Sequence, residues 1–314
     1  MSEGETTPSP AAPSPAAPSP AAPSQAGASQ DEVNAGAASE TPVQDLLDAT
    51  AATRTGPGPD GTERFAATAP DWFGDRVFGG VVVAQALSAA AQTVDPPMRP
   101  HSLHGYFLGA LRAGPVDLSV RALRDGRTFS TRHVTSEQHG RTALWCTVSF
   151  HADEDGDEYQ LPMPAAPEPV ADPVDDDDDW QPPMFDFVEL GPSPPRADGT
   201  YRSTRRAWVR TIEALPDDPL CHLQVAAYLS DMTGASFRPH SLGEWGRHTD
   251  ASIDHAVWFH HPFRADEWLY MDFHALVNHH GRATIRGELF DRSGRLCLSM
   301  AQELLIRELE EPSS

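Results

Sequence analysis

A buried carboxylate and a buried amide are the clearest chemical signals in this sequence. Asp231 ends the predicted helix Leu220–Asp231 and shares a helical face with Gln224 and Ala227, so we expect it to point inward. The helix dipole disfavours a negative charge there by roughly 0.3–1 kcal/mol, and a buried carboxylate is costly without hydrogen-bond partners. The alternative is a partly exposed aspartate that closes the helix onto Thr233.

The predicted strand Arg295–Glu308 carries an amide on its apolar face. Alternation puts five side chains on that face: Leu298, Met300, Gln302, Leu304 and Ile306. A buried amide needs partners for its two N–H donors and its oxygen, and taken alone a satisfied core glutamine is the simpler interpretation. Ser252 begins the strand Ser252–His260; its hydroxyl is a candidate for the same site or a turn residue after Asp250.

The glycine pair Gly79-Gly80 opens a predicted helix that runs to Val94 and is apolar or small on nearly every face, so this helix is buried. Because glycine lacks a Cβ, another group can approach the first backbone N–H groups, those of Gly79, Gly80 and Val81. Such groups bind anions or polarised carbonyl oxygens. On this stretch alone, a glycine turn before a core helix is the simpler interpretation.

The elements around these residues occur twice in the same order. In the first half a strand near Glu63 and the glycine-led helix precede four predicted strands: Leu103–Leu111, Val116–Leu123, Thr128–Ser136 and Thr142–His151. In the second half a strand at Thr204–Ile212 and the Asp231 helix precede four more: Ser252–His260, Trp268–Val277, Ala283–Phe290 and Arg295–Glu308. Hairpin-linked strands beside one helix indicate an α+β fold of two repeats. The fragment Ala86–Ala89 aligns with Tyr228–Asp231, with Ala where the second helix has Asp.

Composition divides the chain into four segments. Residues 1–42 repeat Pro, Ala and Ser and cannot bury enough apolar surface to fold, so we expect a disordered tail. The two repeats occupy residues 43–151 and 199–310. Residues 152–198 are a Pro-rich linker with five adjacent aspartates, Asp175–Asp179, which repel one another and stay solvated. The G-x-G-x-x-G at 56–61 is interrupted by prolines, and we expect a loop there.

The charge balance excludes several classes of function. The 314 residues include 23 basic and 46 acidic side chains, a net charge of −23, which argues against nucleic acid and anionic membrane surfaces as partners. There is no lysine, which excludes Schiff-base chemistry. Cys146, Cys221 and Cys297 are far apart, as expected for buried thiols of a reducing cytoplasm. We find no membrane span, no signal peptide and no H-E-x-x-H, and expect neither metal nor cofactor.

Several motifs occur in an order that resembles the acyl-CoA thioesterase II family. They are Phe78-Gly79-Gly80, His101-Ser-Leu-His104, Arg124-Asp-Gly-Arg127, Tyr228-Leu-Ser-Asp231, Ser252-Ile-Asp-His255 and Gln302-Glu303. The resemblance covers about residues 43–310 and implies a double hotdog, two copies of a long helix wrapped by an antiparallel sheet. The chain departs from the family at Leu304, where glycine is usual, and Ser252 lacks the methyl group of a threonine.

The resemblance implies hydrolysis of fatty acyl-CoA to free fatty acid and CoA. Asp231, Ser252 and Gln302 of the second repeat would hold the attacking water, with Asp231 as general base or water-orienting group. The backbone N–H groups of Gly79–Val81 are our candidates for the oxyanion site. The resemblance also implies a homo-oligomer.

Coenzyme A carries phosphates, so an acidic chain needs a local basic patch to bind it. Arg124, Arg127 and Arg132 flank one predicted hairpin and are candidates, although each also suits an ordinary solvated turn. His101 matches a family motif, and we expect it to be structural or to line the substrate pocket.

Two other functions remain open. A non-catalytic acyl-CoA-binding protein or sensor would keep the pocket while losing the chemistry, and Leu304 leaves room for it. A hotdog hydratase or dehydratase would pair a histidine with Asp or Glu, which Asp231 and Gln302 do not match. A serine-hydrolase thioesterase is disfavoured because no G-x-S-x-G occurs.

Overall fold

The computed structural model describes residues 41–72, 74, 76–169, 182–190, 204–233 and 248–308. The predicted tail therefore lies outside the described residues up to position 40, and Thr41 and Pro42 lead into a helix instead. The acidic run Asp175–Asp179 also lies outside them.

The first repeat contains two helices and the strands β1 to β6, which form one half of the sheet. Its elements are α2 (Pro42–Thr50), β1 (Thr53–Pro57), the 3₁₀ turn η1 (Pro59–Gly61), β2 (Thr62–Ala69), α3 (Gly79–Ala91), β3 (Arg99–Phe107), β4 (Gly114–Asp125), β5 (Phe129–Gln138) and β6 (Arg141–His151). The predicted helix and four strands all appear within a few residues of their expected bounds. α3 is buried along nearly its whole length, as its uniformly apolar composition predicts.

After α2, the first repeat has two strands, a helix and four strands, and the described second repeat follows that order with one strand divided into β9 and β10. Its elements are β7 (Phe185–Glu189), β8 (Thr204–Thr211), α4 (Pro219–Ser230), β9 (His248–Ser252), β10 (Asp254–Phe259), β11 (Leu269–His279), β12 (Arg282–Asp291) and β13 (Leu296–Glu308). Asp218 caps α4 by accepting a hydrogen bond from the Leu220 N–H, and Pro219 occupies the first turn.

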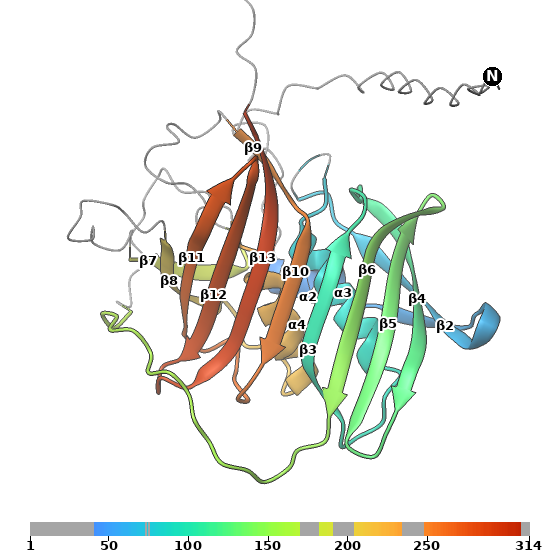
Figure 1. Ribbon diagram of the computed structural model, residues 1–314, viewed down its shortest axis with the longest axis horizontal. Helices are drawn as coiled ribbons and strands as arrows, with labels where there is room; N and C mark the ends of the chain where they lie inside the picture. Colours follow the sequence, from blue (N-terminus) through green and yellow to red (C-terminus); the bar gives the residue numbers. More distant parts are fainter. Residues whose placement is uncertain are drawn as a thin grey trace, which may run out of the picture. The chain divides into compact units, whose positions relative to one another are not determined.

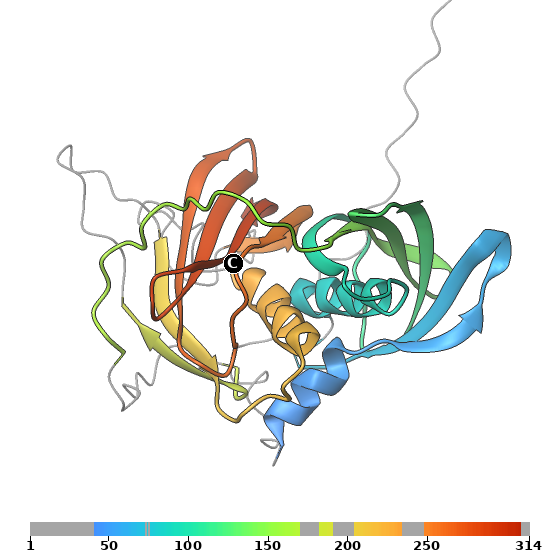
Figure 2. The same cartoon turned by 90° about the horizontal axis from the view of Figure 1, so that it is seen from below.

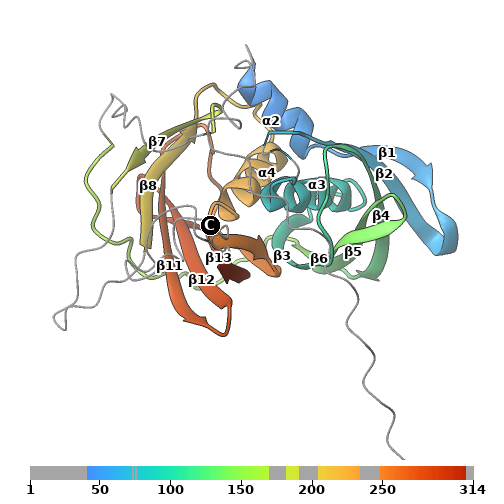
Figure 3. The same ribbon diagram turned by 90° about the horizontal axis from the view of Figure 1, so that it is seen from above.

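All described strands join one antiparallel sheet. Its order is β1-β2-β4-β5-β6-β3-β10-β13-β12-β11-β8-β7, with β9 added beside β13. β3 of the first repeat pairs with β10 of the second, so the two halves share a continuous hydrogen-bonded ladder (Figure 1). Figures 2 and 3 show α3 and α4 side by side within the curve of the sheet. This arrangement confirms the expected double hotdog.

The core lies between the two central helices and the inner face of the sheet. The largest fully buried side chains include Phe65, Phe150, Phe187, Phe273 and Tyr228. α2 packs against both α3 and α4, and its Leu46 is buried in the same core. Removal of this apolar area from water, at about 25 cal/mol per Å², is the main force that holds the two repeats together.

The structure differs from the sequence-based expectation in three segments. β1 occupies Thr53–Pro57, where we expected part of a loop, and forms a hairpin with β2. β7 lies inside the segment 152–198 and pairs with β8, which adds an edge strand that the proline content concealed. The expected single strand Ser252–His260 is broken at Ile253 into β9 and β10.

The described part of the connection after β6 runs across to the second repeat (Figure 1). Gln160 hydrogen-bonds the backbone of Gly294 and Leu296, and the Pro167 carbonyl accepts from Trp208 Nε1 at 2.7 Å. This contact covers an aromatic cluster on the outer side of the second half, which includes Tyr270 and Phe290. No helix among the described residues is both long and apolar enough to cross a bilayer.

Candidate active site

Three polar side chains from three separate elements meet beside the end of α4. Asp231 is the C-cap of α4, Ser252 ends β9, and Gln302 lies midway along β13. Gln302 Nε2 donates to Asp231 Oδ1 at 2.6 Å and to Ser252 Oγ at 2.7 Å. Ser252 Oγ lies 3.3 Å from the same carboxylate oxygen, so its hydroxyl can donate to Asp231. The three predicted residues thus form one connected group.

Asp231 points inward, as its helical face predicts, and its side chain is almost fully buried. Burial raises the pKa of Asp231 to about 7, because a charged carboxylate loses hydration there. The hydrogen bonds from Gln302, Ser252 and the Gly80 N–H act in the opposite direction and keep the rise from being larger. A carboxyl group with this pKa can accept and return a proton near neutral pH.

Gln302 is held in one amide orientation by its neighbours. It is buried on the apolar face of β13, as strand alternation predicts. Thr233 Oγ1 donates to Gln302 Oε1 at 3.1 Å, so the amide oxygen is occupied and both N–H groups face Asp231 and Ser252. The local sequence predicts Thr233 only as a residue that closes the helix. Its role in orienting the amide follows from a contact between residues 69 positions apart in the chain, which no local pattern reveals.

The start of α3 lies against the end of α4. A Cβ on Gly79 would come within 2.7 Å of Asp231 Oδ2, and one on Gly80 within 2.5 Å of the Tyr228 carbonyl oxygen. Only glycine permits this approach, and it allows the Gly80 N–H to hydrogen-bond Asp231. The Val81 N–H bonds the Phe78 carbonyl at 3.1 Å. Of the three N–H groups predicted as oxyanion donors, two therefore have partners within the protein.

A histidine that the sequence analysis did not single out borders this group. His255 Nε2 lies 2.8 Å from Ser230 Oγ, and Ser230 donates to the Ala227 carbonyl, so we assign the imidazole N–H to Nε2. Burial lowers the pKa of His255 to about 4, while Gln302 acts to raise it. The ring is therefore neutral at physiological pH. The sequence contains one indication that His255 is buried: it lies two residues before Val257, so the two side chains share the inward face of the strand.

The other predicted substrate residues lie elsewhere. His101 Nε2 lies 2.8 Å from Ser149 Oγ, and its ring packs edge-on to Phe129, on β3, β6 and β5 of the first repeat. Arg132 is buried, and its guanidinium bonds Thr93, Asp125 and backbone carbonyls, so it ties the β4–β5 hairpin to the end of α3. Arg124 and Arg127 are exposed on that hairpin.

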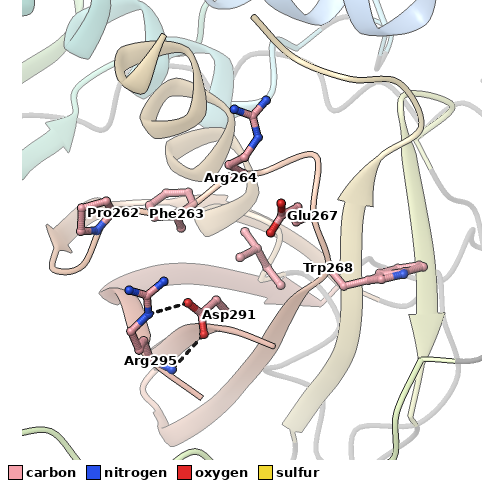
Figure 4. Close-up of a pocket in the computed structure, with 8 residues that line it drawn as sticks. Pro262, Phe263, Arg264, Glu267, Trp268, Asp291 and Arg295 are labelled. Carbon is pink, nitrogen blue, oxygen red and sulfur yellow. Dashed lines mark hydrogen bonds and ion pairs between the residues drawn. The ribbon is translucent and has the colours of Figure 1, made fainter. Parts of the chain in front are cut away.

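A separate surface pocket lies beside the β12–β13 turn (Figure 4). It is lined by Pro262, Phe263, Arg264, Glu267, Trp268, Leu269, Asp291 and Arg295. Arg295 is paired with Asp291, and Arg264 with Asp217 and Asp266. Because carboxylates already neutralise both arginines and Glu267 adds a further negative charge, the pocket does not favour the phosphates of an anionic ligand.

Metal and thiol chemistry receive no support from the described residues. Within them, no three His, Cys, Asp or Glu side chains gather as a metal site would require. Cys146, Cys221 and Cys297 are free and buried, and burial raises the thiol pKa of each, to about 12 for Cys146 and Cys297 and about 11 for Cys221. A thiol in this state is a poor nucleophile.

Comparison with known proteins gives one consistent result. Residues 68–151 match the model of the acyl-CoA thioesterase N-terminal domain, and residues 164–306 match that of the C-terminal domain. Human acyl-coenzyme A thioesterase 8 is 33% identical over 263 residues, which span 74% of this chain and 81% of that protein. Acyl-CoA thioesterase 2 of Haemophilus influenzae is 33% identical over 256 residues, which span 74% of this chain and 88% of that protein.

Solved structures agree. Acyl-CoA thioesterase II TesB2 from Mycobacterium marinum superposes with a TM-score of 0.70 at 32% identity, over 86% of this chain and all of the other. The dehydratase domain of PpsC from Mycobacterium tuberculosis, with a TM-score of 0.54 at 14% identity over 83% of this chain and 99% of the other, shares the fold alone. Sequence matches across both repeats and the close superposition place this chain in the acyl-CoA thioesterase family, whose members are thioester hydrolases.

Proposed function

We propose that this protein hydrolyses fatty acyl-CoA to free fatty acid and CoA by direct attack of a water held by Asp231, Ser252 and Gln302. The observation that carries the proposal is the meeting of three side chains from α4, β9 and β13. Ser252 and Gln302 both bond the buried carboxylate of Asp231, whose pKa is raised to about 7. General base catalysis is most efficient when the pKa of the base lies near the working pH.

In the proposed mechanism, Asp231 accepts a proton from water as the water oxygen bonds to the thioester carbonyl carbon. Ser252 orients that water, and Gln302 contributes by holding Asp231 and Ser252 in position through its two N–H groups. The tetrahedral intermediate then collapses, the carbon–sulfur bond breaks, and the proton passes from Asp231 to the departing sulfur. Thiolates are good leaving groups, so no covalent enzyme intermediate is needed.

The oxyanion would be stabilised by a backbone N–H at the start of α3. Gly80 donates to Asp231 and Val81 to Phe78, which leaves the Gly79 N–H as the candidate among the three. Gly79 is adjacent to Asp231 Oδ2, so a carbonyl bound there would lie beside the base. Donors of this kind contribute about 2.7–4 kcal/mol to transition-state stabilisation.

The test is release of free thiol from acyl-CoAs of short, medium and long chain length by wild type and Asp231→Asn. We expect the variant to lose about 10²–10⁴-fold in kcat, the usual contribution of a general base. The matched control is Asp117→Asn, an exposed aspartate on β4, which should keep wild-type rates. Unchanged turnover in Asp231→Asn would refute its role, and binding of acyl-CoA without turnover by wild type would favour the sensor.

The CoA phosphates have two remaining candidates among the predicted arginines, Arg124 and Arg127, because the Arg132 guanidinium is committed inside the protein. We expect Arg124→Ala/Arg127→Ala to raise KM for acyl-CoA and leave KM for the matching acyl-pantetheine, which lacks phosphates, unchanged. Equal KM changes for both substrates, or none for either, would remove this hairpin from the binding site.

A further inference from the structure

The strand that presents Ser252 contains one residue more than its partner. β10 pairs with β13 at Ala256↔Ala301, and β9 pairs with β13 at Ser252↔Leu304. Between these two pairs, β13 advances by three residues while the opposite strand advances by four. Ile253, which belongs to neither strand, is the extra residue of a β-bulge.

This bulge decides which side chain enters the active site. His255 and Ser252 are three positions apart, so in a regular strand they would face opposite sides of the sheet. Here both point inward, since His255 bonds Ser230 of α4 and Ser252 bonds Gln302. In a ladder without the bulge, Ile253 would take the place opposite Leu304 and Ser252 would face the other side.

A charged side chain lies at the bulge and hydrogen-bonds the opposite strand. Asp254 Oδ1 accepts a hydrogen bond from the Glu303 N–H at 2.8 Å. The Ile253 N–H donates to the Glu303 carbonyl at 2.8 Å, and the Ile253 carbonyl accepts from the Phe107 N–H at 2.9 Å. A bulge leaves a backbone N–H without its ladder partner, and the Asp254 carboxylate supplies the missing acceptor for Glu303.

We propose that Asp254 is a positioning residue: it holds the Ile253 bulge in place through the Glu303 N–H and thereby turns Ser252 toward Asp231 and Gln302. Asp254 does not touch the reacting atoms. The bulge also joins the two repeats, because the N–H of Phe107, the last residue of β3, donates to the Ile253 carbonyl. The Phe107 ring in turn lies beside Gly79 at the start of α3. This inference rests on the proposed role of Ser252 in holding the water.

The test is a double-mutant cycle on acyl-CoA hydrolysis with Ser252→Ala, Asp254→Ala and the double variant. Loss of one water-orienting hydrogen bond costs about 1–1.5 kcal/mol, or about tenfold in rate. We expect each single variant to lose about that factor in kcat with KM unchanged. The double variant should be no slower than Ser252→Ala, because Asp254 acts only through Ser252.

Two conservative variants separate the hydrogen bond from charge and from general destabilisation. Asp254→Asn keeps an acceptor oxygen for the Glu303 N–H and should retain activity within about twofold, well inside the effect of one hydrogen bond. Asp254→Glu keeps the charge but moves the carboxylate by one methylene, and should lose kcat. These two variants test the proposal even where Asp254→Ala does not fold.

Distinct outcomes separate this inference from the proposed function. If Ser252→Ala is fully active, the proposed role of Ser252 fails first. If Ser252→Ala is impaired but Asp254→Ala is not, the bulge does not depend on Asp254. A further loss of kcat in the double variant, or an active Asp254→Glu beside an impaired Asp254→Asn, would show that Asp254 acts by another route.

Discussion

The last turns of the two central helices correspond in sequence but have different neighbours. Ser88 of α3 accepts a hydrogen bond from the Ala52 N–H at 3.1 Å, so that helix end is closed by the backbone after α2. The equivalent Ser230 of α4 contacts His255, and the next residue is Asp231 rather than Ala89. The end of α3 therefore contacts the backbone after α2, whereas the end of α4 lies among titratable side chains, those of Asp231 and His255.

The starts of the same helices differ in a complementary way. The alignment that pairs Ala89 with Asp231 pairs Gly80 with His222. The Gly80 N–H reaches Asp231, whereas His222 is buried and its Nδ1 accepts from the Ala265 N–H at 3.1 Å. Of the two central helices, α3 begins with glycines and α4 ends with a carboxylate, so the two repeats together form this candidate site.

The largest effect on stability should come from Ala89→Asp, which places a carboxylate at the corresponding position of the first repeat. Ala89 is fully buried among apolar side chains of the core. Ala89→Asp should therefore lower the free energy of unfolding by about 3–5 kcal/mol, the cost of an uncompensated buried charge. Urea denaturation measures this, with Ala89→Ser as the uncharged control. A loss below about 1 kcal/mol would mean that the two helix ends are more alike than the contacts indicate.

Replacement of Gly80, whose N–H bonds Asp231, should lower the stability of the protein nearly as much. A Cβ in Gly80→Ala would lie 2.5 Å from the Tyr228 carbonyl oxygen, so α3 and α4 must separate. We expect a loss of about 1–3 kcal/mol in stability, typical of overpacking, together with a lower kcat. Gly156→Ala is the control, because a Cβ there meets nothing within 4 Å. Equal stability of both variants would contradict the close approach of the helices.

The activity should depend on pH through Asp231. Only the carboxylate can accept a proton, and burial raises its pKa to about 7. The logarithm of kcat/KM should therefore rise by about one unit per pH unit below 7 and level off above it. A profile that is flat from pH 5 to 8 would remove Asp231 as the base.

Stability should change in the opposite direction. The folded-state pKa of Asp231 lies above the value of about 3.9 in an unfolded chain, so the folded protein binds the proton more tightly. This contribution is complete below about pH 4 and is lost as pH rises through 7. Relative to Asp231→Asn, wild type should lose at most about 1.4 kcal/mol per pH unit across that window, measured by denaturation at several pH values. A constant difference between the two proteins would indicate an ordinary pKa.

The smallest effect should come from Ser252→Thr. A threonine hydroxyl can make the same contacts with Gln302 and Asp231, and the added methyl lies at a half-buried position. We expect kcat to stay within about threefold of wild type, less than the tenfold effect of losing one hydrogen bond. A loss as large as that of Ser252→Ala would mean that the site has no room for the methyl group.

Local pattern was sufficient for much of the fold and for two of the three candidate catalytic positions. Helical spacing predicted that Asp231 points inward, and strand alternation predicted the same for Gln302; both side chains are buried. The order of strands in each repeat followed from apolar runs and turn residues. Local pattern was not sufficient for β7, because this short strand lies in a proline-rich segment and is defined by its pairing with β8.

Periods of 3.6 and 2 are properties of the backbone and are read from neighbouring residues, so the amino-acid pattern alone placed Asp231 and Gln302 on core-facing sides of their elements. How those residues meet depends on contacts between distant segments of the chain. The bulge at Ile253 depends on its partner strand, the bond from Gly80 to Asp231 joins the two repeats, and the burial of Arg132 depends on Thr93 at the end of α3. Each of these contacts joins residues far apart along the chain, so no local period encodes it.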